Sequence, residues 1–304
     1  MRYPDAALGK LAAHGARYRG WLPNARAPEI FARHLATVHV PRRFYVDLLP
    51  GIPTIRVFEA LACGIPLLSA PWEDAERLFR PGQDYLIARD EAAMLRHMRA
   101  VQADAGLRAA LASSGLETIR ARHTCAHRVD ELLAIAARLR HAGGGRRMRI
   151  AFYGSSLLSS YWNGAATYYR GMLSALHRRG YRATFYEPDA FDRQQHRDIA
   201  PPDWAEVRVY PATEAALREV VAEAARADIV VKASGVGVFD DALLQGVMAA
   251  AARPEVIRIF WDVDAPATLA ELAAASDHPL RRTLLPELDL VLDLWRRPAG
   301  GAGL

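Results

Sequence analysis

Residues 51–66 read GIPTIRVFEALACGIP, and this stretch has the signals of a helix that turns directly into a strand. Pro53 and Thr54 can begin the helix, because proline suits the first helical turn and threonine suits the position before it. The glycine and the second proline end the helix. The pattern predicts a helix over 54–63 and a strand over 66–70, as in an α/β unit.

The start of the predicted helix offers a site for a diphosphate. Backbone N–H groups at a helix N-terminus are unpaired, and the positive end of the helix dipole lies there. Thr54 and Arg56 lie at this end, and Glu59, one turn further on, could accept hydrogen bonds from a ribose diol. The alternative is that Arg56 and Glu59 form a surface ion pair at i,i+3 spacing.

Short β-rich runs alternate with helical patterns on both sides of this stretch. Strands are expected at 17–22, 36–40 and 84–88, and helices at 6–14, 27–34, 91–102, 105–122 and 126–141. Strand, helix and strand at this spacing imply right-handed crossovers and a parallel sheet.

Residues 141–147, HAGGGRR, form the clearest linker, because they are glycine-rich and have no periodicity. Beyond it, strands are expected at 148–154, 183–186, 207–210, 229–233, 256–261 and 290–294, and helices at 164–179, 214–225 and 240–252. This pattern predicts a doubly wound α/β unit, whose ligands bind at the carboxyl ends of the strands. We therefore divide the chain into a unit at 1–142, a linker at 143–147 and a unit at 148–304.

Residues 59–66, EALACGIP, closely resemble the donor-binding signature of GT-B glycosyltransferases. The neighbouring motifs TIRVFE at 54–59, PWE at 71–73 and FRPG at 79–82 are similar to those of spore-maturation-protein-like glycosyltransferases, and the resemblance covers roughly residues 18–136. It implies a nucleotide-diphosphate-sugar donor, with its diphosphate near Thr54 and Arg56 and its ribose on Glu59. Many retaining members carry a second glutamate about two turns earlier, where this chain has Pro50-Gly51-Ile52, so that sugar-contacting role is not carried over.

The second unit is similar to the acceptor-side domain of the same family. The motifs that carry this resemblance are GSSLLSSYWNGAA at 154–166, VKASGVG at 231–237 and FWDVDAP at 260–266. It implies that the loop with Asn163 and Gly164 faces the donor across a cleft, where its backbone N–H groups can meet an anion or a sugar hydroxyl. The loop lacks the GxGxxG pattern, which disfavours a nicotinamide-dependent reductase or epimerase.

The resemblances predict two Rossmann-like domains of the GT-B type in the reverse of their usual order, with the donor-binding half first. The first unit opens with a helix in place of a strand, and the second ends without a closing helix, so each half is expected to be incomplete. A chain with exposed sheet edges would be expected to pair with a second copy or a complementary chain.

A general base that deprotonates an acceptor hydroxyl is expected among Asp262, Asp264, His196 and Glu187. Asp262 is preferred because it falls at the carboxyl end of a strand. The alternatives are a helix cap for Asp264, an exposed loop for His196 and an ordinary strand-end turn for Glu187.

Metal binding is not expected. Asp262 and Asp264 could hold Mg²⁺ or Mn²⁺ against a diphosphate, but GT-B enzymes generally act without such a metal. His123 and His127 are four residues apart, yet the sequence offers no third ligand beside them. We expect no cofactor other than the donor itself.

Composition excludes several classes of protein. The net charge of +5 comes almost wholly from arginines on helices that also carry acids, which favours solvated helix faces over nucleic-acid binding. The two cysteines form no CxxC pair, so a disulfide framework is not expected. No apolar run reaches the length of a membrane span, and the N-terminus does not read as a signal peptide. These features predict a soluble, cytoplasmic protein.

Two functions fit these predictions. The first is sugar transfer from a nucleotide-diphosphate donor to an unidentified acceptor. The second is a catalytically incompetent fusion of two glycosyltransferase fragments, acting as a nucleotide-binding or interaction module. Glu59 and Asn163 should face one cleft in the first case and different solvent faces in the second.

Overall fold

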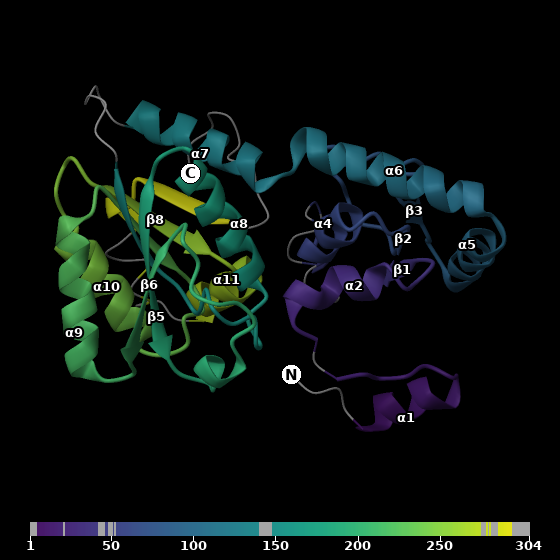
Figure 1. Cartoon of the computed structure of the whole chain (residues 1–304), viewed down its shortest axis with the longest axis horizontal. Helices are drawn as coiled ribbons and strands as arrows, with labels where there is room; N and C mark the ends of the chain where they lie inside the picture. The colour runs from purple at the N-terminus through teal and green to yellow at the C-terminus, as the bar shows by residue number, and fades with distance from the viewer. Residues whose placement is uncertain are drawn as a thin grey trace.

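The computed structural model describes residues 5–20, 22–41, 46–47, 51, 53–139, 148–274, 278, 280 and 285–293. It has the predicted α/β architecture, with parallel sheets flanked by helices (Figure 1). Three parts of the sequence predictions lie outside the described residues. They are the linker predicted at 143–147, Pro50 and Ile52 at the position where many retaining members carry a second glutamate, and the last residue of the strand predicted at 290–294. None of the described helices is both long and apolar enough to cross a membrane.

The first unit is built on a small parallel sheet. Its strands are β1 (Thr37–His39), β2 (Leu67–Ser69) and β3 (Leu86–Ile87), in the order β1-β2-β3. Its helices are α1 (Asp5–Ala13), α2 (Ala27–Phe31), α4 (Ile55–Ala62), α5 (Glu91–Ala103) and α6 (Ala105–Arg122). Leu67 and Leu68 point to opposite faces, because side chains alternate along a strand. Leu67 packs with α4 and Leu68 packs with α5, so helices cover both faces of this sheet.

Two predictions for the first unit are wrong. Residues 17–20, the first part of the strand expected at 17–22, are exposed and irregular, and they belong to neither described sheet. Asp84, expected to begin the third strand, is instead a buried anchor that accepts hydrogen bonds from Arg80, Ser114 and Thr118. Burial opposes its ionisation, but these hydrogen bonds outweigh burial and hold the pKa of Asp84 below its usual value.

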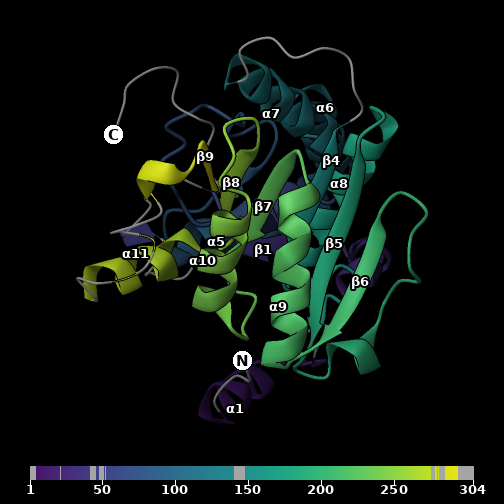
Figure 2. The ribbon, with the colours of Figure 1, turned by 90° about the vertical axis from the view of Figure 1, so that its left-hand side faces the viewer.

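The second unit has the predicted doubly wound sheet (Figure 2). Its parallel strands are β4 (Arg149–Tyr153), β5 (Arg182–Asp189), β6 (Glu206–Pro211), β7 (Ile229–Ala233), β8 (Ile257–Asp262) and β9 (Leu290–Asp293). Its helices are α8 (Ala165–Arg178), α9 (Glu214–Glu223), α10 (Asp240–Ala250) and α11 (Ala265–Ala274). The order β6-β5-β4-β7-β8-β9 reverses direction between β4 and β7, and ligands of such sheets bind at this reversal.

Helix α7 (Cys125–Leu139) follows α6 in the sequence but packs on the second unit (Figure 1). Val129 and Ala136 of α7 are buried in the core that α8 forms with the larger sheet. The division at residue 142 remains a prediction from sequence, whereas the packing places α7 with the residues beyond it.

Gly171 on α8 allows the close approach of α7. A Cβ atom at this position would overlap the sulfur of Cys125, so Gly171→Ala is expected to lower the free energy of unfolding by about 1–2 kcal/mol. Urea denaturation followed by circular dichroism measures this loss. The double variant Gly171→Ala/Cys125→Ala should recover most of it, and Gly164→Ala, with open space around the added atom, serves as the control. Equal losses in the single and double variants would contradict the proposed overlap.

Candidate functional site

The start of α4 is tied to the ends of two strands. His39 and Ser69 are register partners at the carboxyl ends of β1 and β2. The Ser69 hydroxyl donates to the carbonyl of Ala70 and therefore accepts from Nδ1 of His39, at 2.8 Å. Nε2 of His39 is then the acceptor for the Thr54 hydroxyl, at 2.7 Å. Thr54 precedes α4 as expected, but its side chain is held by His39 and makes no bond to the helix.

Arg56 and Glu59 form the ion pair that was one of the two sequence interpretations. Their side chains meet at 2.9 Å, with 48% of Arg56 and 18% of Glu59 exposed. Burial raises the pKa of Glu59, and the nearby Arg56 cation partly opposes this rise. The pair therefore differs from an exposed surface pair, because the carboxylate lies at the wall of a cavity.

This cavity lies between the two units, and we call it the interunit cavity. It has a volume of about 320 Å³. Helix α4 contributes Ile55, Phe58 and Glu59 to its wall, and α8 of the second unit contributes Thr167 and Tyr168. The remaining wall includes Asn24 near α2, His123 and Cys125 at the junction of α6 and α7, Arg128, and Cys63 at the end of α4. Its composition is apolar with a few convergent polar groups, as in small-molecule sites.

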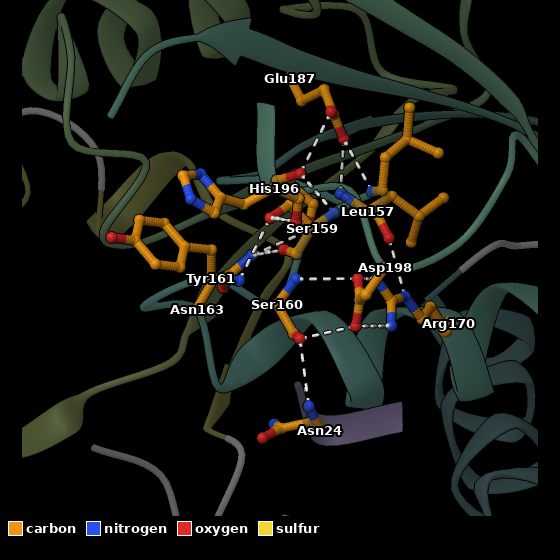
Figure 3. Close-up of polar contacts among 12 residues, drawn as sticks. Asn24, Leu157, Ser159, Ser160, Tyr161, Asn163, Arg170, Glu187, His196 and Asp198 are labelled. Atoms are coloured by element: carbon orange, nitrogen blue, oxygen red, sulfur yellow. Dashed lines mark hydrogen bonds and ion pairs between the residues drawn. The ribbon is translucent and has the colours of Figure 1, made fainter. Parts of the chain in front are cut away.

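The loop after β4 is held by a dense network of hydrogen bonds (Figure 3). The side chain of Asn163 accepts from the Ser155 hydroxyl and donates to the carbonyls of Ser156 and Ser159. Asn163 is therefore turned into its own loop, and Gly164 lies exposed at the start of α8. Neither belongs to the wall of the interunit cavity. The part of α8 that reaches the cavity lies about one turn further on, at Thr167 and Tyr168.

Glu187 is the buried centre of this network. Its side chain is 0% exposed and accepts hydrogen bonds from the backbone N–H groups of Leu157 and Leu158 and from the side chains of Ser156 and Gln194. The interpretation of Glu187 as an ordinary strand-end turn is therefore wrong. Its carboxylate shapes the loop and lies outside the wall of the cavity.

Asp198 ties the same loop to α8 and to the first unit. It accepts a two-pronged ion pair from Arg170 and a hydrogen bond from the Ser160 hydroxyl at 2.6 Å. The Ser160 oxygen in turn accepts the backbone N–H of Asn24, at 3.2 Å (Figure 3). Because Asn24 lines the interunit cavity, this bond joins the cavity wall to the loop after β4.

Asp262 lies at the carboxyl end of β8, as predicted, but its side chain is hydrogen-bonded to neighbouring residues of the fold. Its Oδ1 atom accepts from the hydroxyls of Ser234 and Thr268 and from the backbone N–H of Asp264. The side chain is 6% exposed and lies outside the wall of the interunit cavity. Asp264 begins the turn into α11, since its carbonyl accepts the N–H of Thr268.

His196 and the two histidines at the junction of α6 and α7 are already engaged. His196 stacks on Tyr161, with ring centroids 4.0 Å apart, and His123 contacts the carbonyl of Leu78 through Nε2. Nδ1 of His127 contacts the Thr124 hydroxyl. Among the described residues, no three side chains of histidine, cysteine, aspartate or glutamate are placed to hold a metal ion.

Several wall residues were not identified from the sequence. No sequence pattern marked Thr167 and Tyr168 as binding residues. The outward face of a helix becomes the wall of a binding site only when another unit docks against it. The cysteines Cys63 and Cys125 were judged only by their distance in sequence, yet both line the interunit cavity as free thiols. Burial raises the pKa of both thiols, which disfavours the reactive thiolate.

Comparison with known proteins gives one family match. Residues 2–134 match a family described as "Glycosyl transferase-like", which supports glycosyl transfer as the general chemistry of the first unit. No curated protein matches the chain. One solved structure, described as "Functional and Structural Characterization of a beta-Glucosidase Involved in Saponin Metabolism from Intestinal Bacteria", shares 13% identity at a TM-score of 0.21, and the likeness covers 66% of this chain and 37% of that one. A likeness at this level carries no argument about fold or function.

Proposed function

We propose that this protein transfers a sugar from a nucleotide-diphosphate donor to an acceptor, with the donor bound in the interunit cavity. The observation that carries the proposal is the position of Glu59. It lies within the region matched to the glycosyltransferase-like family and on the wall of a cavity that α8 of the second unit closes.

The proposed roles follow from the chemistry of each group. The carboxylate of Glu59 accepts hydrogen bonds from the two hydroxyls of the donor ribose. The first turn of α4, which Thr54 precedes, supplies N–H groups for the diphosphate, and Arg56 adds a cation beside them. This positive end favours departure of the diphosphate, because negative charge grows on it as the sugar leaves.

Asp262 is retained as the proposed general base for the acceptor hydroxyl. Since its Oδ1 atom holds Ser234, Thr268 and the N–H of Asp264, the proton would go to Oδ2. Asn163 and Gly164 are proposed to act through the loop that they shape at the start of α8 rather than through their side chains.

A nucleotide-binding module without turnover is the second candidate. It is favoured by one observation, that the second unit contributes Thr167 and Tyr168 but no acid or histidine to the cavity wall. The two candidates share donor binding and differ in whether diphosphate is released with an acceptor present.

Titration calorimetry with uridine and guanosine diphosphates and their sugar derivatives tests donor binding. Glu59→Gln is expected to weaken binding by about tenfold, because a carboxylate that accepts hydrogen bonds from the ligand loses its charge. The control is Glu29→Gln, since Arg26 and Glu29 form another i,i+3 pair in the same unit and Glu29 lies outside the cavity wall. Absence of binding by every nucleotide, or equal binding by Glu59→Gln and the wild type, would contradict the proposal.

A further inference from the structure

Three loops at the carboxyl edge of the second sheet contain strained backbone. Trp162 follows β4 with a φ of 50°, Phe191 and Asp192 follow β5 with φ of 56°, and Phe239 follows β7 with φ of 53°. Left-handed backbone is unfavourable for side chains of this size, and residues held in it cluster at binding sites. Both sides of the reversal between β4 and β7 therefore carry such residues.

Two of these strained residues present large rings to solvent. Trp162 is 54% exposed and Phe191 is 56% exposed. Trp162 packs edge-on against Tyr161, with centroids 5.9 Å apart, and Tyr161 stacks on His196 at an interplanar angle of 8°. Nδ1 of His196 contacts the carbonyl of Asp192, beside Phe191. We call Tyr161, Trp162, Phe191 and His196 the aromatic rim.

The aromatic rim is held in place by contacts with the loops after β4, β5 and β7. The Phe191 ring lies directly against Gly237, where an added Cβ atom would overlap it. The Arg193 guanidinium lies 5.0 Å from the centre of that ring and donates to the carbonyls of Ser155 and Val236, which joins the loops on both sides of the reversal. The Ser159 hydroxyl donates to the carbonyl of His196 at 2.7 Å (Figure 3). Exposed rings on a rigid base are pre-organised for a flat ligand.

A pyranose ring fits this surface chemically. Its C–H bonds carry partial positive charge, and the face of an aromatic ring carries partial negative charge. The sugar hydroxyls project from the edge of the ring, so they stay in water when one face of the sugar stacks on an aromatic side chain.

The aromatic rim is connected to the wall of the interunit cavity through one hydrogen bond. Tyr161 follows Ser160, whose hydroxyl oxygen accepts the N–H of Asn24 on the wall of that cavity. We propose that the aromatic rim binds a pyranose ring of the acceptor, so that the acceptor is a saccharide or glycoside. The identification of the bound saccharide as the acceptor rests on the proposed glycosyl transfer. Saccharide binding itself can be tested without any donor.

The test uses the full chain and the methyl β-glycosides of glucose, galactose and mannose, with the open-chain polyol sorbitol as a ring-free probe. Saturation-transfer NMR and calorimetry should detect at least one pyranoside and no sorbitol. Trp162→Gly and Phe191→Gly should weaken that binding by roughly fivefold or more. Both should fold, because glycine accepts left-handed backbone without strain.

Matched variants separate loss of a ring from relief of strain. Asp192→Gly relieves the same backbone conformation next to Phe191 without removing a ring, and Trp162→Phe keeps a ring, so both should retain pyranoside binding. Nucleotide-diphosphate binding should be unchanged in Trp162→Gly and weakened in Glu59→Gln, with the reverse for the pyranoside. The failure of one site is then distinguishable from the failure of the other.

Three results would overturn the inference. They are absence of binding by all three pyranosides, equal pyranoside binding by Trp162→Gly and the wild type, and a dimer in sedimentation analysis that Trp162→Gly dissociates. The last result would assign the aromatic rim to contact between copies of the chain.

Discussion

Replacing Glu187 with alanine is expected to lower the free energy of unfolding of the second unit by about 3–5 kcal/mol, because a buried carboxylate holds four donors there. Those donors are the N–H groups of Leu157 and Leu158 and the side chains of Ser156 and Gln194. Alanine removes both oxygens and leaves the donors in a site without solvent, since Glu187 is 0% exposed. The loss is a large fraction of the roughly 5–15 kcal/mol that stabilises a typical domain.

Urea denaturation followed by circular dichroism measures this effect. Glu187→Gln keeps one acceptor oxygen and should cost less than the alanine variant, which provides a folded form if Glu187→Ala does not fold. Glu206→Gln, on the neighbouring strand with 56% of its side chain exposed, should lie within about 0.5 kcal/mol of the wild type. A loss below about 1 kcal/mol for Glu187→Ala would show that the loop does not depend on this carboxylate.

The burial of Glu187 could not be predicted from the sequence. The run Glu-Pro-Asp at the end of a strand has the composition of an exposed turn. Its burial arises from the loop at 155–159, about 30 residues earlier in the chain, and no local pattern reports such a partner. By contrast, α4 and β2 were predicted to within one residue at each end, because capping, apolar periodicity and the Gly-Ile-Pro turn are all local signals.

The candidate site was predictable only in part. Glu59 could be found, because its motif lies on a single helix and resembles a known signature. The opposite wall could not, since Thr167 and Tyr168 reach the cavity only through the docking of one unit on the other. Helix α7 also packs on the second unit. Its amphipathic sequence predicts that one face is buried but does not indicate which unit buries that face.

Lowering the pH from 6.5 to 4 is expected to destabilise the first unit by about 2–3 kcal/mol through His39 alone. Burial, assisted by the Arg56 cation, lowers the pKa of His39 from 6.5 to about 4. Between these values the unfolded chain binds a proton that the native histidine does not, so stability falls as the pH falls through this window and then levels below it. The histidine contribution is fully present above pH 6.5.

The physical reason is that neutral His39 has one donor and one acceptor nitrogen, and each has its partner. Nδ1 donates to Ser69, and Nε2 accepts from the Thr54 hydroxyl before α4. Protonation turns Nε2 into a donor, so the Thr54 hydroxyl must reverse, and a positive charge appears near Arg56 in a buried site. Chemical denaturation at pH 7 and at pH 4.5 measures the loss, and His39→Gln should remove most of its pH dependence. The exposed His34 supplies the control, because His34→Gln should keep the wild-type dependence. An identical pH dependence in His39→Gln and the wild type would mean that His39 does not control the start of α4.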